Sequence, residues 1–133
     1  MPSAEEESLS TIPLFAHLSA RQLRKLVRSV VEHRYEPGTE VVREGGRTAT
    51  LFVVLEGSAT VVRGDRTISR RGPGEYFGEI SLIDGRPRAA SVIAETPMRC
   101  LVLEQDSLRA LLKSEPPVAW ALLESLASRL RGE

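Results

Sequence analysis

The sequence has few of the residues on which many functional sites depend. Among its 133 residues there are one cysteine and two histidines, and Lys plus Arg balance Asp plus Glu at 18 each. The lone Cys100 excludes an internal disulfide, and two histidines leave few ligands for a catalytic metal. Zero formal charge excludes a global field that would attract nucleic acid or an anionic membrane. Any site for an anion must therefore be local.

Long hydrophobic runs are also missing. No apolar stretch approaches the roughly 18 residues needed to span a bilayer. Residues 1–7 have neither the basic leader nor the apolar segment of a secretion signal. We therefore expect a cytoplasmic protein without membrane contact. The length suits a single domain, 1–133, which is large enough to bury a core without disulfides or metal.

The first part of the chain has a helical pattern. We expect the acidic residues 1–8 to be loosely ordered. Ser19 and Gln22 have the spacing of a capping box, which marks the start of a helix. Apolar residues follow at the helical spacing of i, i+3, i+4 and i+7: Leu23, Leu26, Val27 and Val30. The pattern predicts a helix over 20–32, with its basic face exposed to solvent. We assign 1–33 as a helical lead-in.

From residue 34 to residue 103 the pattern changes to short β-prone runs separated by turn residues. This pattern predicts a mainly β fold with flanking helices, namely an antiparallel β-roll or jelly roll, also called a double-stranded β-helix. Gly64 and Asp65 have the order of a two-residue hairpin loop of type II′. The predicted strands are 40–42, 51–55, 58–63, 66–69, 90–94 and 99–103.

Residues 104–133 predict two helices. Asp106 is placed to cap a short helix ending at Lys113, and a longer helix covers 117–131. The longer helix carries one apolar stripe: Ala119, Leu122, Leu123, Leu126, Ala127 and Leu130. We interpret the stripe as packing against the β-roll, with a homodimer seam or an effector-docking surface as the alternatives. Trp120 lies just off the stripe and is interpreted as a core or interface anchor.

The segment 77–92 carries the strongest functional signal. Gly78 lets the backbone approach a ligand closely, and residues 79–83 can form a short helix whose free amide groups face an anion. Arg88 offers a guanidinium fork for phosphate oxygens, while the Glu79 carboxylate is suited to a ribose hydroxyl. One continuous segment therefore predicts a pocket for a cyclic nucleotide.

This segment resembles the phosphate-binding cassette of cyclic nucleotide-binding domains, the family of catabolite activators, protein kinase A regulatory subunits and cyclic nucleotide-gated channels. The family pattern is Phe-Gly-Glu, an aliphatic residue, a small residue and Leu, then, after a short link, Pro-Arg, a small residue and Ala. The chain matches this pattern without gaps at Phe77, Gly78, Glu79, Ile80, Ser81, Leu82, Pro87, Arg88, Ala89 and Ala90.

The resemblance implies different roles for different cassette residues. Arg88 and the amides around Ser81 and Ala89 would hold the cyclic phosphate, and Glu79 would hold the ribose 2′-OH. In the family, Thr directly after the arginine favours cGMP, and Ala89 stands there in this chain. We therefore expect cAMP as the ligand, with cGMP as the alternative, and no metal or other cofactor. The predicted ligand contacts are Phe77, Gly78, Glu79, Ile80, Ser81, Arg88, Ala89 and Ala90.

The expected function is a non-catalytic intracellular sensor that regulates a partner or an attached effector through its flanking helices. A metalloenzyme barrel is disfavoured because His17 and His33 both fall in the predicted helical lead-in, outside the barrel. A protein-docking scaffold that no longer binds nucleotide is the remaining alternative. The chain has room for one long C-terminal helix but not for a helix-turn-helix domain, so we expect no contact with nucleic acid. What covers the base stays open.

Overall fold

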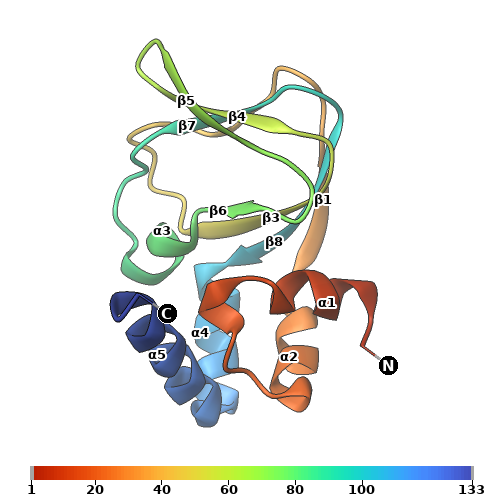
Figure 1. Cartoon of the computed structure of the whole chain (residues 1–133), viewed down its shortest axis with the longest axis vertical. Helices are drawn as coiled ribbons and strands as arrows, with labels where there is room; N and C mark the ends of the chain where they lie inside the picture. The colour runs from red at the N-terminus through yellow and green to blue at the C-terminus, as the bar shows by residue number, and fades with distance from the viewer. Residues whose placement is uncertain (1, 133) are drawn as a thin grey trace. The chain divides into compact units, whose positions relative to one another are not determined.

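A computed structural model of the chain describes residues 2–132. These residues cluster into two compact units, one formed by Val31–Gln105 and the other by residues 2–30 together with 106–132. The first unit contains the strands and the short helix α3 (Glu79–Asp84), whereas the second is helical (Figure 1). The strands are β1 (Val31–Tyr35), β2 (Glu40–Val42), β3 (Thr50–Glu56), β4 (Ala59–Arg63), β5 (Arg66–Arg71), β6 (Tyr76–Phe77), β7 (Ser91–Ala94) and β8 (Met98–Glu104).

The strands pair into two antiparallel four-stranded sheets that face each other (Figure 1). Their orders are β1-β8-β3-β6 and β2-β7-β4-β5. Between β4 and β5, Gly64 has φ +61°, and no non-glycine residue among those described has positive φ. Positive φ at the first loop position alone is the type II′ pattern, so the predicted hairpin is confirmed. The predicted fold class, an antiparallel β-roll with flanking helices, is confirmed as well.

The core of the β unit lies between its two sheets. Phe52 of β3 and Phe77 of β6 stack with ring centroids 4.9 Å apart. Residues two apart along a strand share one face, so β8 contributes Met98, Cys100 and Val102 to this core. Burial of each large apolar side chain stabilises the folded state by about 1.5–3 kcal/mol. The core consists of Val42, Phe52, Val54, Ala59, Phe77, Val92, Ala94, Met98, Cys100 and Val102.

The helical unit is built from elements at both ends of the chain. Helix α1 packs against α2, and the short 3-10 helix η1 packs against α5. The Ser19 and Gln22 capping box is present at the start of α2, as predicted. Asp106, predicted as a cap, instead lies within the first turn of α4. The helices are α1 (Ala4–Ser10), η1 (Pro13–Phe15), α2 (Ala20–Val27), α4 (Gln105–Ser114) and α5 (Pro116–Leu130).

Three expectations for the N-terminal part are wrong. Helix α1 occupies residues predicted to be loosely ordered, and its cap forms because Ser3 Oγ accepts a hydrogen bond from the Glu6 N–H at 3.1 Å; Met1 lies outside the described residues. The helix predicted over 20–32 ends at Val27. Residues from Val31 onward pair with β8 instead, so the helical lead-in is shorter than 1–33 and His33 belongs to the β-roll.

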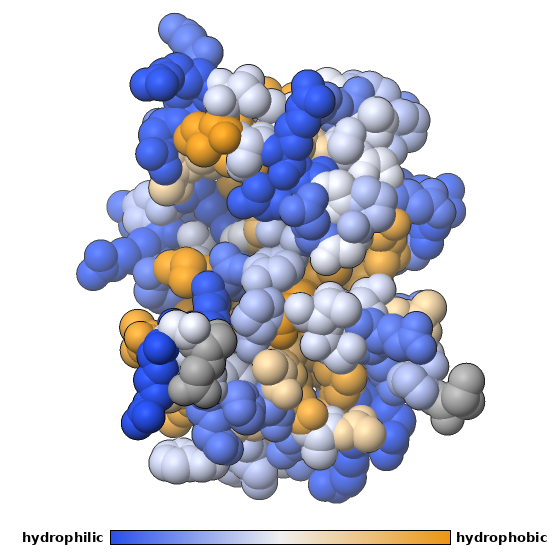
Figure 2. Space-filling view, viewed as in Figure 1, coloured by the Kyte–Doolittle hydropathy of each residue, from blue (hydrophilic) through white to orange (hydrophobic). Residues whose placement is uncertain are grey.

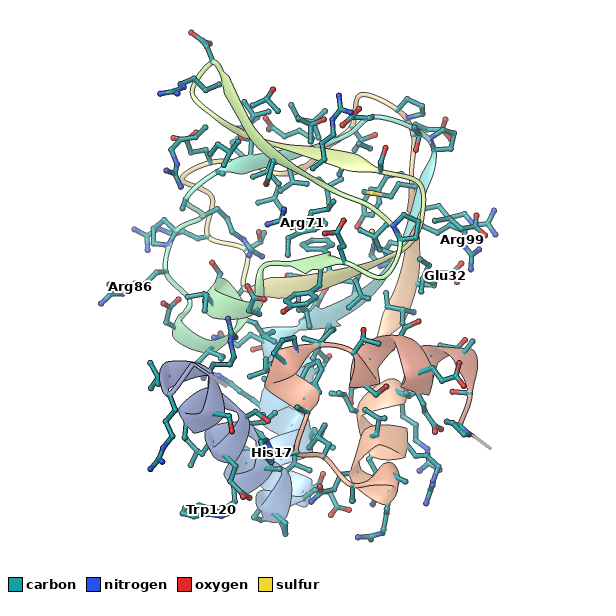
Figure 3. All side chains as sticks on the ribbon, viewed as in Figure 1. His17, Glu32, Arg71, Arg86, Arg99 and Trp120 are labelled. Carbon is teal, nitrogen blue, oxygen red and sulfur yellow. The ribbon has the colours of Figure 1, made fainter. Side chains whose placement is uncertain are left out.

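The predicted apolar stripe of α5 is also wrong. Its buried face is formed by Val118, Ala121, Leu122 and Ser125, of which only Leu122 was in the stripe. Leu123 and Leu130 are 55% and 90% exposed. Ser125 tolerates burial because its hydroxyl donates to the Ala121 carbonyl at 3.1 Å and accepts the His17 backbone N–H at 3.3 Å. Trp120 is 67% exposed and points away from the helix, which excludes it as a core anchor (Figure 3).

The surface in view is mostly hydrophilic, and its hydrophobic residues form separate patches (Figure 2). Across residues 2–132, no helix combines the length and the apolar character needed to cross a membrane.

Candidate functional site

The cassette begins at a backbone position that only glycine fills without strain. Gly78 follows β6 and precedes α3 with φ +94°, in the left-handed region. A Cβ atom at this position would lie 2.4 Å from the Thr50 carbonyl oxygen and 2.6 Å from Arg88 Nη1. Because both contacts are far below van der Waals distance, Gly78 permits the close approach of β3 and of the Arg88 guanidinium.

Arg88 is held at this point by backbone hydrogen bonds. Its amide donates to the Gly46 carbonyl and its own carbonyl accepts from the Gly45 amide, both at 2.8 Å. Its Nη2 donates to the Thr50 carbonyl at 2.5 Å, and Nη1 donates to the Gly78 carbonyl at 3.4 Å. Strand β3 and the loop before it therefore orient a side chain that stands 38 residues further along the sequence.

The guanidinium of Arg88 is buried without a compensating negative charge. The residue is 6% exposed, and Nε has no hydrogen-bond partner within residues 2–132. No ion pair in this part of the chain includes Arg88. Burial lowers the pKa of the guanidinium below its ordinary value. A buried cation costs free energy unless an anion pairs with it, so this arrangement is suited to an anionic ligand.

Beside Arg88 is a pocket of about 160 Å³. Every residue predicted as a ligand contact lines it: Phe77, Gly78, Glu79, Ile80, Ser81, Arg88, Ala89 and Ala90. The structure therefore brings the two halves of the cassette, before and after the link, around one cavity. Whether they contact a ligand stays a prediction.

Four further residues complete the wall, and the sequence interpretation did not identify them as site residues. Val42, Val61 and Val92 come from the sheet β2-β7-β4-β5, and Arg71 comes from the end of β5. Figure 3 shows Arg71 between this sheet and the cassette. Nothing in the sequence marked Arg71, because the predicted strand 66–69 ended two residues before it. With β5 ending at Arg71, its side chain lies on the same face as Ser69, whose hydroxyl it contacts at 2.8 Å.

A second pocket of about 410 Å³ adjoins the first. The two pockets share Arg71, Phe77, Gly78 and Glu79, and the second is completed by Gly74, Glu75 and Tyr76. The combined space has a cationic donor at Arg88 and a carboxylate at Glu79. Such a site can hold an anion together with a neighbouring hydroxyl group. Among residues 2–132 there is no group of three or more His, Cys, Asp or Glu side chains arranged to hold a metal ion.

Comparison with known proteins identifies the family of this site. The family model described as the cyclic nucleotide-binding domain matches residues 32–115, more than half of the chain. The chain belongs to the cyclic nucleotide-binding domain family. This confirms the resemblance stated for the cassette, and the match extends well beyond it to include every strand from β2 to β8.

Two curated relatives are similar to this chain over part of their own length. A cAMP-dependent protein kinase regulatory subunit of Mycosarcoma maydis is 36% identical over 93 residues, which are 67% of this chain and 18% of the relative. A protein named as a candidate potassium channel in Rhodopseudomonas palustris is 32% identical over 114 residues, 84% of this chain and 28% of the relative. The chain thus spans less than a third of either relative.

Two solved structures have a fold similar to that of this chain. The N-terminal domain of a transcriptional regulator from Streptomyces coelicolor is 35% identical, with a TM-score of 0.88 over 94% of this chain and 91% of that one. The catabolite activator protein of Thermus thermophilus is 32% identical, with a TM-score of 0.73 over 91% of this chain and 59% of that one. A similar fold therefore occurs in a domain of a transcriptional regulator and in a catabolite activator protein.

Proposed function

We propose that this cyclic nucleotide-binding domain binds cAMP and acts as a non-catalytic cytoplasmic sensor that regulates a partner or an attached effector. The observation that carries the proposal is the buried guanidinium of Arg88, whose Nε lacks a partner within residues 2–132. A cyclic phosphate supplies the missing negative charge and the missing acceptor. The ligand thereby relieves the cost of burying the cation, which favours tight binding.

The rest of the pocket accounts for the remaining parts of a cyclic nucleotide. The amides around Ser81 and Ala89 are assigned to the phosphate, and the Glu79 carboxylate is assigned to the ribose 2′-OH. Ala89 has no hydroxyl with which to bind a guanine amino group, and this supports cAMP. The similarity to a regulatory subunit of a cAMP-dependent protein kinase gives further support.

The chemistry of the wall supports a sensor and not an enzyme. Neither histidine nor cysteine lines the pocket, so Ser81 has no imidazole or thiolate beside it to act as a general base. A ligand regulates only if it binds one arrangement of the protein better than another, and couplings of about 1–3 kcal/mol are ordinary. Helix α3 supplies Glu79, Ile80 and Ser81 to the wall, so a ligand in the pocket would contact this helix directly.

The test is isothermal titration of the purified chain with cAMP and with cGMP, using Arg88→Ala and the control Arg86→Ala. Arg86 is exposed and points away from the roll, yet it lies only two residues before Arg88 (Figure 3). Loss of a charged hydrogen-bonding partner costs about 1.5–3 kcal/mol. We therefore expect Arg88→Ala to weaken binding by about tenfold to 100-fold, and Arg86→Ala to change it less than about twofold. Equal affinity in the wild type and Arg88→Ala would overturn the assigned phosphate site.

A docking scaffold without nucleotide binding is the second candidate. The exposed side chains of Trp120, Leu123 and Leu130 on α5 favour it, because large apolar residues gathered on one helix are typical of contact surfaces. Thermal unfolding distinguishes the two functions. A ligand at a hundred times its dissociation constant adds about 2.7 kcal/mol to the free energy of unfolding. An unchanged melting temperature with millimolar cAMP, and with millimolar cGMP, favours the scaffold.

A further inference from the structure

Strand β1 is an edge strand whose outer side is unpaired within residues 2–132. It lies at one end of the sheet β1-β8-β3-β6 and pairs with β8. Within this part of the chain, Val31–Tyr35 makes no backbone hydrogen bond apart from that pairing. Alternate residues of a strand direct their N–H and C=O groups to opposite sides, so part of the backbone of β1 is directed away from β8. These groups are available to a further strand.

This edge lies away from the candidate site. Strands β1 and β6 are at opposite ends of the sheet, and β6 leads into the cassette. No residue of β1 lines either pocket of the site. Figure 3 shows Glu32 of β1 on the side of the roll opposite Arg86 of the cassette. A strand added to β1 would therefore leave the pockets open, and its pairing would be independent of nucleotide binding.

The side chains of β1 are complementary to a second copy of the same strand. The strand reads Val-Glu-His-Arg-Tyr, so one acidic and one basic residue flank the central His33. In an antiparallel pair of two such strands centred on His33, Glu32 of each copy lies opposite Arg34 of the other. Val31, which is 59% exposed, then lies opposite Tyr35. Opposite charges, and an aromatic residue opposite a β-branched one, are both favourable cross-strand pairs.

Both charged side chains are available for such a pair. Arg34 is 78% exposed, and within residues 2–132 its one ion pair is with Glu32 at 3.9 Å, too long for a hydrogen bond. Glu32 accepts two hydrogen bonds from Arg99, at 3.0 Å and 3.2 Å. These bonds lower the pKa of the Glu32 carboxyl below its ordinary value, so the group is ionised at neutral pH. A carboxylate has about four acceptor positions, so it can also bind the guanidinium of a second copy.

We propose that β1 is a docking surface for a second copy of this chain, with the two strands antiparallel about a twofold axis at His33. The two four-stranded sheets then form one continuous sheet across the dimer. A row of like charges on an edge strand would repel a second copy, whereas Glu32 and Arg34 are opposite in sign and attract it. Strands of five residues bury a small interface. We therefore expect a weak dimer, with a dissociation constant of about 10–100 μM.

The experiment is analytical ultracentrifugation of the wild type, Arg34→Glu, Glu32→Arg and an equimolar mixture of the two variants. Each variant alone carries two like charges on β1, so like charges lie opposite each other in a self-pair. In the mixture, an acidic strand can lie opposite a basic strand. We expect the wild type to dimerise, each variant alone to dimerise at least about tenfold more weakly, and the mixture to return to within about threefold of the wild type.

Arg66→Glu is the matched control, because Arg66 is an exposed arginine on β5, the edge strand of the other sheet. This charge reversal should leave dimerisation within about twofold of the wild type. Glu32→Arg loses the two hydrogen bonds from Arg99, so circular dichroism must first show that it folds. If it does not fold, the comparison of Arg34→Glu with Arg66→Glu decides, because neither of these variants removes those bonds.

Three results would overturn the pairing of β1. They are a wild type that stays monomeric at about 500 μM, a dimer that Arg34→Glu leaves unweakened, and a mixture of folded variants that dimerises no better than either alone. Titration with cAMP separates this pairing from the proposed function, because Arg34→Glu should bind cAMP within about twofold of the wild type. A monomer that binds cAMP contradicts the pairing alone, and a dimer that binds no nucleotide contradicts the proposed function alone.

Discussion

Gly78 and Arg88 depend on each other through a contact that leaves no room for a methyl group. A Cβ at Gly78 would meet both Arg88 Nη1 and the Thr50 carbonyl that the same arginine binds. Gly78→Ala therefore combines a left-handed backbone penalty of about 1–2 kcal/mol with overpacking of about 1–3 kcal/mol. We expect a clear loss of unfolding free energy in urea, together with weaker binding of cAMP.

The matched control for this substitution is Gly38→Ala. Gly38 has φ +87°, close to the +94° of Gly78, but a Cβ there would have nothing within 4 Å. This variant isolates the backbone penalty, so we expect a loss of about 1–2 kcal/mol and unchanged affinity for cAMP. If both variants lose the same stability and Gly78→Ala still binds normally, the close approach to Arg88 has no role in the site.

Among the elements, α2 depends on a reciprocal cap. The Gln22 amide donates to Ser19 Oγ at 3.2 Å, and the Ser19 amide donates to Gln22 Oε1 at 2.9 Å. Ser19→Ala should lower the free energy of unfolding by about 1 kcal/mol, measured by urea denaturation. Ser10→Ala is the control, since its hydroxyl donates to the Glu7 carbonyl on an exposed surface, and we expect a change within about 0.5 kcal/mol. Equal losses in the two variants would show that the cap adds nothing.

Features that depend on neighbours in sequence were predictable, and those that depend on distant partners were not. The Ser19 cap and the Gly64 hairpin follow from residues within a few positions of each other. The end of α2 does not follow from such neighbours. Val30 continues the helical spacing, but the residues from Val31 to Tyr35 pair with β8. The buried face of α5 was missed because Ser125 is polar, and its burial is permitted by His17, 108 residues away.

The same distinction between neighbouring and distant residues applies to the candidate site. The cassette is one continuous segment, so its residues were identifiable together, and the structure gathers them around one pocket. The partners of the Arg88 guanidinium are the backbone carbonyls of Thr50 and Gly78, and a backbone carbonyl carries no side-chain signal in any sequence. Arg71 could not be identified as a site residue without the true end of β5, because the predicted strand stopped two residues before it.

At the scale of the whole molecule, no internal disulfide is possible, so the β unit depends on its apolar core for stability. Cys100 is fully buried in that core, and burial raises the pKa of its thiol to about 12. The pKa of Tyr35 is also raised to about 12, first by burial and then by the proximity of Cys100. Both groups stay protonated in the folded state at a pH where an unfolded chain has already ionised them.

This difference predicts that alkaline pH weakens the fold. An ordinary tyrosine is half ionised at pH 10.0 and an ordinary thiol at pH 9.0, so around and above these values the unfolded state binds fewer protons than the folded state. The free energy of unfolding then falls as pH rises, until the folded groups ionise near 12. With allowance for solvent screening of the half-buried tyrosine, the two groups account for a loss of about 1–2 kcal/mol between about pH 8 and pH 10.5.

Urea denaturation at the two pH values, on the wild type and on Tyr35→Phe combined with Cys100→Ala, measures this loss. The double variant lacks both groups, so its stability should fall less between the two pH values, whatever the removed side chains cost at pH 8. The single variants test the coupling: because the Cys100 thiolate contributes to the raised pKa of Tyr35, their effects on the pH dependence should not add. An equal fall in the wild type and the double variant would place the alkaline sensitivity elsewhere in the chain.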